Sequence, residues 1–236
     1  MRNESTTARS AWDKARSEVM KIKLEAILQE ADVLFSRKGY NSTSLDDISA
    51  RLDITKTALY HYVKNKNELL FLCYQRSVEL TEQCYNQADE AGTTGLEKVR
   101  AYLRIDASNG VMAMTPLNEL DAIRDPKRRQ QLGQRISACE TRFRGFIEQG
   151  IRDGSIQNCD PYLTSLFILG ASRYMMQWYN PDARQDIKAI VEQFISFCCH
   201  GIEPPSTAEK RLASPAATAS LAIGEEIASM FVARAG

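Results

Sequence analysis

A short segment of the chain, ITKTALYHYVKNK over residues 54–66, combines side chains suited to contact with nucleic acid. Its first helical turn offers short hydroxyl donors and one cation, and the positive end of a helix dipole at that point favours phosphate. Aromatic and imidazole donors follow one turn later, and two lysines come just past the expected helix end, where a DNA backbone would run. The candidate contact residues are Thr55, Lys56, Thr57, Tyr60, His61, Lys64 and Lys66.

Two helices that precede this segment must hold it in place. An amphipathic pattern predicts a first helix over residues 21–38, which ends at Gly39 because glycine favours the left-handed backbone of a helix C-terminus. Ser44 with Asp47 three residues later is a capping-box pattern, and it predicts a short second helix over 45–52.

A tight connection then leads into the segment itself. Asp53 and Ile54 form the turn, and Thr55 can cap a third helix that runs to about residue 63. The second helix, the turn and the third helix together have the dimensions of a helix-turn-helix, in which the second member of the pair lies in the major groove of DNA.

The rest of the chain is expected to be helical as well. Apolar residues recur at helical spacing and no convincing strand alternation is found, so the fold class is all-α. The expected helices cover residues 69–91, 96–111, 126–154, 161–179 and 183–200. The segment after Gly201 lacks periodicity and carries three of the seven prolines, which indicates a linker before a possible docked terminal helix.

Composition narrows the function further. Lys plus Arg and Asp plus Glu number 30 each, but residues 1–76 hold 13 basic and 10 acidic residues, which leaves the excess of negative charge in residues 77–236. No apolar run is long enough to cross a membrane and the first 20 residues are polar, so we expect a cytoplasmic protein without a membrane partner. The six cysteines form no CxxC pair and are expected to be reduced thiols.

Catalysis and metal binding are not favoured. The chain has two histidines and lacks GxGxxG, GxxxxGK[ST] and HExxH, so we expect neither an enzyme nor a bound cofactor. His200 follows Cys198 and Cys199 too closely for a usual structural metal site, and an ordinary helix end is expected there.

Residues 22–70 resemble the DNA-binding domain of the TetR family of bacterial repressors. The resemblance rests on a helix ending LFSRKGY, then TSLDDIS, then ITKTALYHYVKNKNELL. It implies phosphate contacts by Ser44, Thr55, Lys56, Tyr60 and Lys66, and base contacts by Thr57 and His61. Asp53 stands where the family usually has glycine, but aspartate tolerates a left-handed backbone.

The resemblance also implies a homodimer whose larger C-terminal helical domain binds a small-molecule effector and thereby releases DNA. The family's last two helices usually form the dimer interface, and 161–179 with 183–200 are the most apolar pair here, although core packing explains the same pattern. Candidate interface residues are Leu166, Ile190 and Phe194.

An effector pocket is expected between the helices spanning residues 96–178. Met and aromatic groups over residues 173–179 can line an adaptable apolar pocket, with plain core or dimer packing as the alternative. Candidate lining residues are Tyr102, Met112, Phe146, Tyr174 and Trp178. The phrase SRYMMQWYNP is similar to the equivalent helix of TetR-family regulators of fatty-acid and acyl-CoA metabolism, which places acyl-CoA thioesters ahead of other effectors.

The sequence therefore predicts a DNA-binding transcriptional regulator, a repressor released from a pseudo-palindromic operator by an apolar effector. A non-specific or architectural DNA-binding protein is the alternative, but it would need a larger positive excess on its DNA-binding domain. The expected organisation is a flexible arm (1–20), a helix-turn-helix domain (21–67), an effector-binding and dimerisation domain (68–202), and a linker with a terminal helix (203–236).

Overall fold

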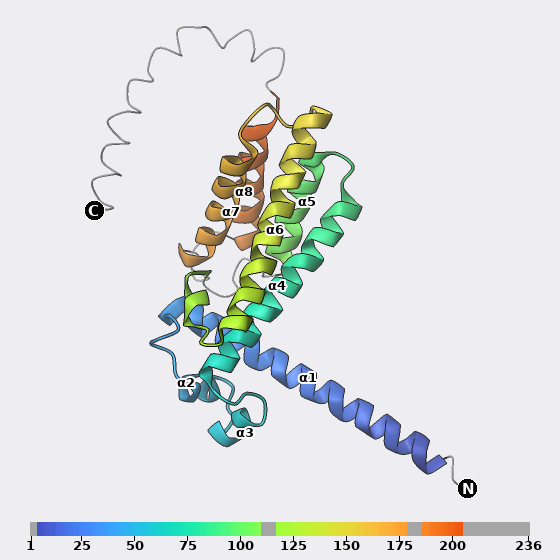
Figure 1. Ribbon diagram of the computed structural model, residues 1–236, viewed down its shortest axis with the longest axis vertical. Coiled ribbons are helices and arrows are strands. Elements are labelled where there is room, and N and C mark those ends of the chain that lie inside the picture. The colour runs from blue at the N-terminus through green and yellow to red at the C-terminus, as the bar shows by residue number, and fades with distance from the viewer. Residues whose placement is uncertain (1–3, 110–116, 179–185, 205–236) are drawn as a thin grey trace.

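The computed structural model describes residues 4–109, 117–178 and 186–204, with side chains for all of these except 4–15, 117–118 and 176–178. All regular structure in these ranges is helical, as predicted (Figure 1). The helices are α1 (Glu4–Lys38), α2 (Leu45–Arg51), α3 (Lys56–Tyr60), α4 (Lys66–Ala91), α5 (Gly95–Ser108), the 3-10 helix η2 (Leu117–Ala122), α6 (Pro126–Asp153), α7 (Pro161–Trp178) and α8 (Ile187–Ile202). None of the described helices is long and apolar enough to span a membrane.

Two hydrophobic cores divide the chain, and α4 contributes to both. The N-terminal core buries apolar side chains of α1, α2, α3 and the first half of α4. The C-terminal core is formed by the second half of α4 with α5, α6, α7 and α8, which make the helical bundle in Figure 1. Because α4 is one continuous helix through both cores, it mechanically links the two domains.

The first helix is longer than the sequence analysis predicts. It begins at Glu4, so the expected flexible arm over residues 1–20 is helical from that residue on. No glycine or proline occurs before Gly39, and nothing in the sequence therefore stops the helix from continuing beyond its packed part. Apolar periodicity identifies only the part that packs, which starts with the half-buried Leu24.

The other helix boundaries largely follow local capping signals. Asp125 caps α6, Pro126 occupies its first turn, and Gly154 ends it with φ +78°. The end of α5 lies at Ser108, before residues 110–116, which the structure does not describe; Met112 and the terminal segment from 205 onward also lie outside the described residues.

Candidate nucleic-acid interface

The helices of the helix-turn-helix pack through buried apolar side chains against the N-terminal core. Leu45 and Ile48 of α2 are buried, as are Leu59 of α3 and Val63 just after it. These side chains pack in the same core as Phe35 of α1. Because one side of the short α3 is fixed to this core, its other side is presented to solvent at a defined angle.

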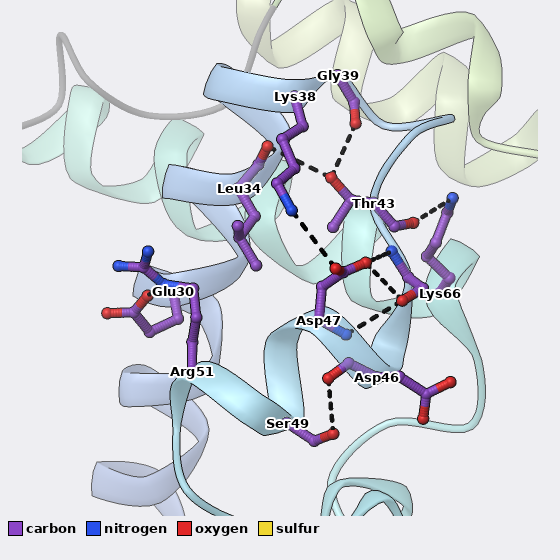
Figure 2. Close-up of polar contacts among 11 residues, drawn as sticks. Glu30, Leu34, Lys38, Gly39, Thr43, Asp46, Asp47, Ser49, Arg51 and Lys66 are labelled. Atoms are coloured by element: carbon purple, nitrogen blue, oxygen red, sulfur yellow. Dashed lines mark hydrogen bonds and ion pairs between the residues drawn. The ribbon is translucent and has the colours of Figure 1, made fainter.

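The start of α2 is fixed by the predicted capping box. The Asp47 N–H donates to Ser44 Oγ at 3.1 Å, and the Ser44 N–H donates to Asp47 Oδ2 at 2.7 Å. Figure 2 shows Asp47 at the centre of these contacts, with the Lys38 ammonium 3.4 Å from its Oδ1. The hydrogen bond from the Ser44 hydroxyl is the main cause that lowers the pKa of Asp47 to about 2.

The turn and the start of α3 also follow the sequence. Asp53 adopts φ 52°, the left-handed conformation that glycine usually supplies at such a turn. Thr55 caps α3 by accepting the Ala58 N–H at 3.1 Å. The Thr55 hydroxyl keeps its own proton for donation, so the cap leaves a donor available for a phosphate oxygen.

Most of the predicted contact residues lie on the exposed side of this motif. Ser44, Thr55, Lys56, Thr57, Tyr60, His61 and Lys64 are all exposed, and 48% of the Tyr60 surface is accessible. The exposed residues of the motif therefore supply hydroxyl, imidazole, phenol and ammonium donors, which is the donor set that reads phosphates and base edges.

One cation of this surface, Lys56, is engaged with a carboxylate in the protein without DNA. Lys56 Nζ lies 2.8 Å from Asp46 Oδ2, and this hydrogen bond is the main cause that raises the pKa of Lys56. Both side chains are about half exposed, so the pair adds little stability, and Lys56 can exchange Asp46 for a phosphate at small cost.

Lys66 makes contacts within the protein that the sequence does not suggest. Its ammonium donates to the carbonyl oxygens of Tyr40 at 2.7 Å and Thr43 at 2.8 Å, and it lies 4.1 Å from the centroid of the Tyr40 ring. Figure 2 shows Lys66 directed at Thr43. Partial burial lowers its pKa. Lys66 thus organises the loop between α1 and α2, and its contact with a phosphate stays a prediction.

A coupling segment of the larger domain, residues 117–125, is attached to the DNA-binding domain by hydrogen bonds between the Asn67 side chain and the backbone of the segment. The Asn67 amide donates to the Ala122 carbonyl at 2.6 Å and accepts the Arg124 N–H at 3.1 Å. Ile123 is 1% exposed and packs in the N-terminal core. The segment runs directly into α6, so Asn67 connects the start of α6 to the first turn of α4.

A second contact ties the same segment to the loop after α1. The Tyr40 N–H donates to Glu119 Oε1 at 3.2 Å. Sequence reasoning missed Tyr40, Asn67 and Glu119, because each bonds a backbone or side-chain group far away in the chain and none belongs to a periodic or capping pattern.

The predicted effector residues do not share one location. Tyr102 and Phe146 are both 4% exposed and belong to one aromatic cluster, in which Tyr102 stacks on Tyr85 with ring centroids 4.2 Å apart. Tyr174, in contrast, is 64% exposed and lies on the outer side of α7, away from this cluster, so its place in a pocket stays a prediction. Met112 and the Trp178 side chain lie outside the described residues.

A buried carboxyl group lies beside this aromatic cluster. Asp106 of α5 is 5% exposed, and burial raises its pKa to about 7 even though Arg173 and a hydrogen bond with Tyr102 favour the charged form. Arg173 is itself 3.6 Å from Glu140, which weakens its influence. The cluster therefore combines aromatic surface with one group that changes charge near neutral pH.

The predicted interface residues differ in exposure. Leu166 is 46% exposed, whereas Ile190 and Phe194 are partly buried against the C-terminal core. Among the described side chains of α7 and α8, the most exposed apolar ones are Phe167 and Phe197, at 73% and 77%. Tyr162, Leu163 and Tyr174 are further exposed apolar side chains of α7. Large apolar side chains in such a concentration are typical of a surface that another protein covers.

Comparison with known proteins agrees with this architecture. The family model described as "Bacterial regulatory proteins, tetR family" matches residues 27–73, and that described as "Tetracyclin repressor-like, C-terminal domain" matches residues 96–202. The chain belongs to the TetR family. As a TetR-family protein it is a helix-turn-helix, DNA-binding transcriptional regulator of the repressor type.

Individual TetR-family relatives match different parts of the chain. The Tn10 TetC protein of Escherichia coli is 38% identical over 63 residues, which are 27% of this chain and 32% of that protein. The repressor KstR2 of Rhodococcus jostii is 22% identical over 185 residues, 76% of this chain and 90% of that protein.

Solved TetR-family structures share the fold over most of the chain. The ketosteroid transcriptional regulator KstR2 of Mycobacterium tuberculosis superimposes with a TM-score of 0.67 at 17% identity, covering 78% of this chain and 96% of that chain. AibR in complex with isovaleryl coenzyme A and operator DNA gives a TM-score of 0.61 at 23% identity, covering 78% and 99%.

Proposed function

We propose that this TetR-family protein is a homodimeric repressor that binds a pseudo-palindromic operator, with α3 of each protomer in the major groove, and that a small apolar effector releases it. The observation that carries the proposal is the exposed surface of α3. Thr57, Tyr60 and His61 stand on a helix whose other side is fixed by buried Leu59, so their positions relative to a groove are defined before DNA binds.

Sequence-specific binding is favoured over architectural binding by the charge of the interface. Lys56 is paired with Asp46, Lys38 with Asp47, and Lys66 with backbone carbonyls. Sequence-independent binders rely on many unpaired cations, because almost all of their affinity comes from phosphate neutralisation. A motif with this few free cations must draw more of its affinity from base contacts.

The proposed switch runs from the C-terminal core to α3 through the coupling segment. An effector beside Tyr102 and Phe146 would bear on α5 and α6, and α6 continues from the segment that Asn67 holds. A small rotation of α4 would then change the spacing of the two recognition helices. A ligand shifts this equilibrium only by its difference in affinity for the two conformations, which is about 1–3 kcal/mol in typical allosteric coupling.

The effector class we propose is an acyl-CoA or another apolar carboxylic derivative. Support comes from the aromatic cluster around Tyr102 and from AibR, a structural neighbour that was solved in complex with isovaleryl coenzyme A and operator DNA. We further propose that Trp178, at the last position of α7, forms part of the site's wall.

Thermal shift and operator release can test the effector. Isovaleryl-CoA, longer acyl-CoAs, free fatty acids and aromatic drugs are compared with free coenzyme A as the control for the nucleotide part. We expect an acyl-CoA to raise the melting temperature and weaken operator binding by about 5- to 150-fold. The Trp178→Ala variant should keep its operator affinity but respond less. If no compound changes either quantity, the proposed effector class is wrong.

A further inference from the structure

The positive charge of the N-terminal region is unevenly distributed along the chain. Residues 1–23 contain six basic and three acidic residues, whereas residues 24–76, which form the packed helix-turn-helix domain and the start of α4, contain seven of each. The folded DNA-binding domain therefore has no net charge of its own. The whole positive excess lies on the segment that precedes its core.

The cations within residues 24–76 are also mostly occupied. Besides Lys38, Lys56 and Lys66, two of the three arginines in this range are paired: Arg51 lies 2.5 Å from Glu30, and Arg76 is 3.2 Å from Asp32. Among the described side chains of this range, only Arg37 and Lys64 are exposed cations without an ion pair. Two free cations per protomer are few for a protein that must hold a polyanion.

The N-terminal extension of α1, residues 4–23, is helical and contains five basic and three acidic residues. It continues the helix beyond the packed domain and projects from the body at the end of the molecule that also holds α2 and α3 (Figure 1). Arg9, Arg16 and Lys23 are seven residues apart, so these positions lie on one side of the helix. They span about 21 Å along its axis, which corresponds to about six base pairs of duplex.

The described side chains of this extension are available for binding. Arg16 and Lys23 are exposed and form no ion pair among the described residues, and Lys21 meets only the exposed Glu18 at 3.2 Å. The side of α1 that carries Lys23 also carries Ile27, which is four residues on and packs in the N-terminal core. The basic positions thus lie on the side of α1 that faces the rest of the DNA-binding domain.

We propose that the extension of α1 is a second DNA-contacting element, which binds the phosphate backbone of duplex DNA flanking each half-site without reading its sequence. Charge complementarity selects this occupant, since the extension holds the domain's only positive excess and the domain itself is neutral. The inference rests on the proposed function only in requiring that the protein binds duplex DNA. It adds a footprint larger than the two recognition helices alone would give.

The test compares two variants of the full chain with equal loss of charge. One carries Arg9→Gln, Arg16→Gln and Lys23→Gln; the control carries Lys127→Gln, Arg152→Gln and Lys188→Gln, three exposed cations of the C-terminal domain. An operator is first selected from a random duplex pool with the wild-type protein. Affinity is then measured against salt concentration on that operator with long flanks and on the same operator cut back to its two half-sites.

We expect the extension variant to lose affinity on the long duplex, with a salt slope smaller by about 0.9 for each phosphate contact removed. On the trimmed duplex it should equal the wild type, and hydroxyl-radical protection of the flanks should disappear. The inference is overturned if variant and control behave alike on both duplexes. It is also overturned if the extension variant changes the oligomeric mass. Failure of the wild type to bind any duplex would instead overturn the proposed function itself.

Discussion

Phe197→Asp is expected to convert the protein into monomers and to abolish specific operator binding. Phe197 is 77% exposed in the protomer although it is a large apolar side chain, which places it in the proposed interface. Its replacement removes about 1.5–3 kcal/mol of apolar burial and places a carboxylate where water is excluded. We therefore expect the dimer dissociation constant to rise at least about 100-fold.

Phe167→Asp should have the same effect, since Phe167 is the equivalent exposed residue on α7. The matched control for the oligomeric mass alone is Ile22→Asp, because Ile22 is 68% exposed but lies on α1, outside the proposed interface; its operator affinity is not compared, since Ile22 belongs to the α1 extension. Analytical ultracentrifugation gives the mass of each variant, and circular dichroism verifies that it is folded. Folded dimers of both phenylalanine variants would place the interface elsewhere.

Asp106→Asn is expected to stabilise the protein at alkaline pH and to flatten its pH dependence. The pKa of Asp106 is about 7 in the folded state and 3.8 in an exposed chain, so the native state binds the extra proton between these values. The protonated form of Asp106 therefore makes its full contribution to the free energy of unfolding below pH 4, and this contribution is lost as the pH rises towards 7. The full difference corresponds to about 4 kcal/mol, because each pKa unit is worth about 1.36 kcal/mol.

Asparagine has the shape of aspartate and never ionises, so the variant removes this loss. Urea denaturation from pH 4 to pH 8 measures the free energy of unfolding directly. The control is Asp121→Asn, which replaces an exposed aspartate and should leave the pH dependence unchanged. If wild type and Asp106→Asn decline in parallel with pH, Asp106 is already solvated or paired in solution.

Local sequence patterns were sufficient to predict the helix starts and the turn of the helix-turn-helix. The Ser44–Asp47 capping box, the Thr55 cap and the left-handed Asp53 each depend on residues no more than three positions apart, and all are present in the structure. The same is true of α6, whose limits follow from Pro126 and Gly154. A signal that is local in sequence is formed almost independently of the rest of the fold.

Contacts between distant segments could not be predicted in this way. Lys66 looks like a DNA-contacting lysine in sequence, but its carbonyl partners at Tyr40 and Thr43 precede it by more than 20 residues. Tyr174 lies in an apolar helix whose several sides look alike in sequence, and only packing decides that it faces outward. The start of α1 was misplaced for another reason, since amphipathic spacing marks packing and not helicity.

The central claim is that α3 reads the DNA sequence, and the affinity of His61→Ala for a selected operator and for a random duplex tests it most directly. His61 is exposed at the end of α3 and has no structural hydrogen bond through its ring among the described contacts. We predict that wild-type protein prefers the selected operator, and that His61→Ala loses about 1–3 kcal/mol on it while binding random duplex as before. Lys64→Gln, the control, should weaken binding to both duplexes equally. Equal losses of His61→Ala on both duplexes, or no preference by the wild type, would contradict the account.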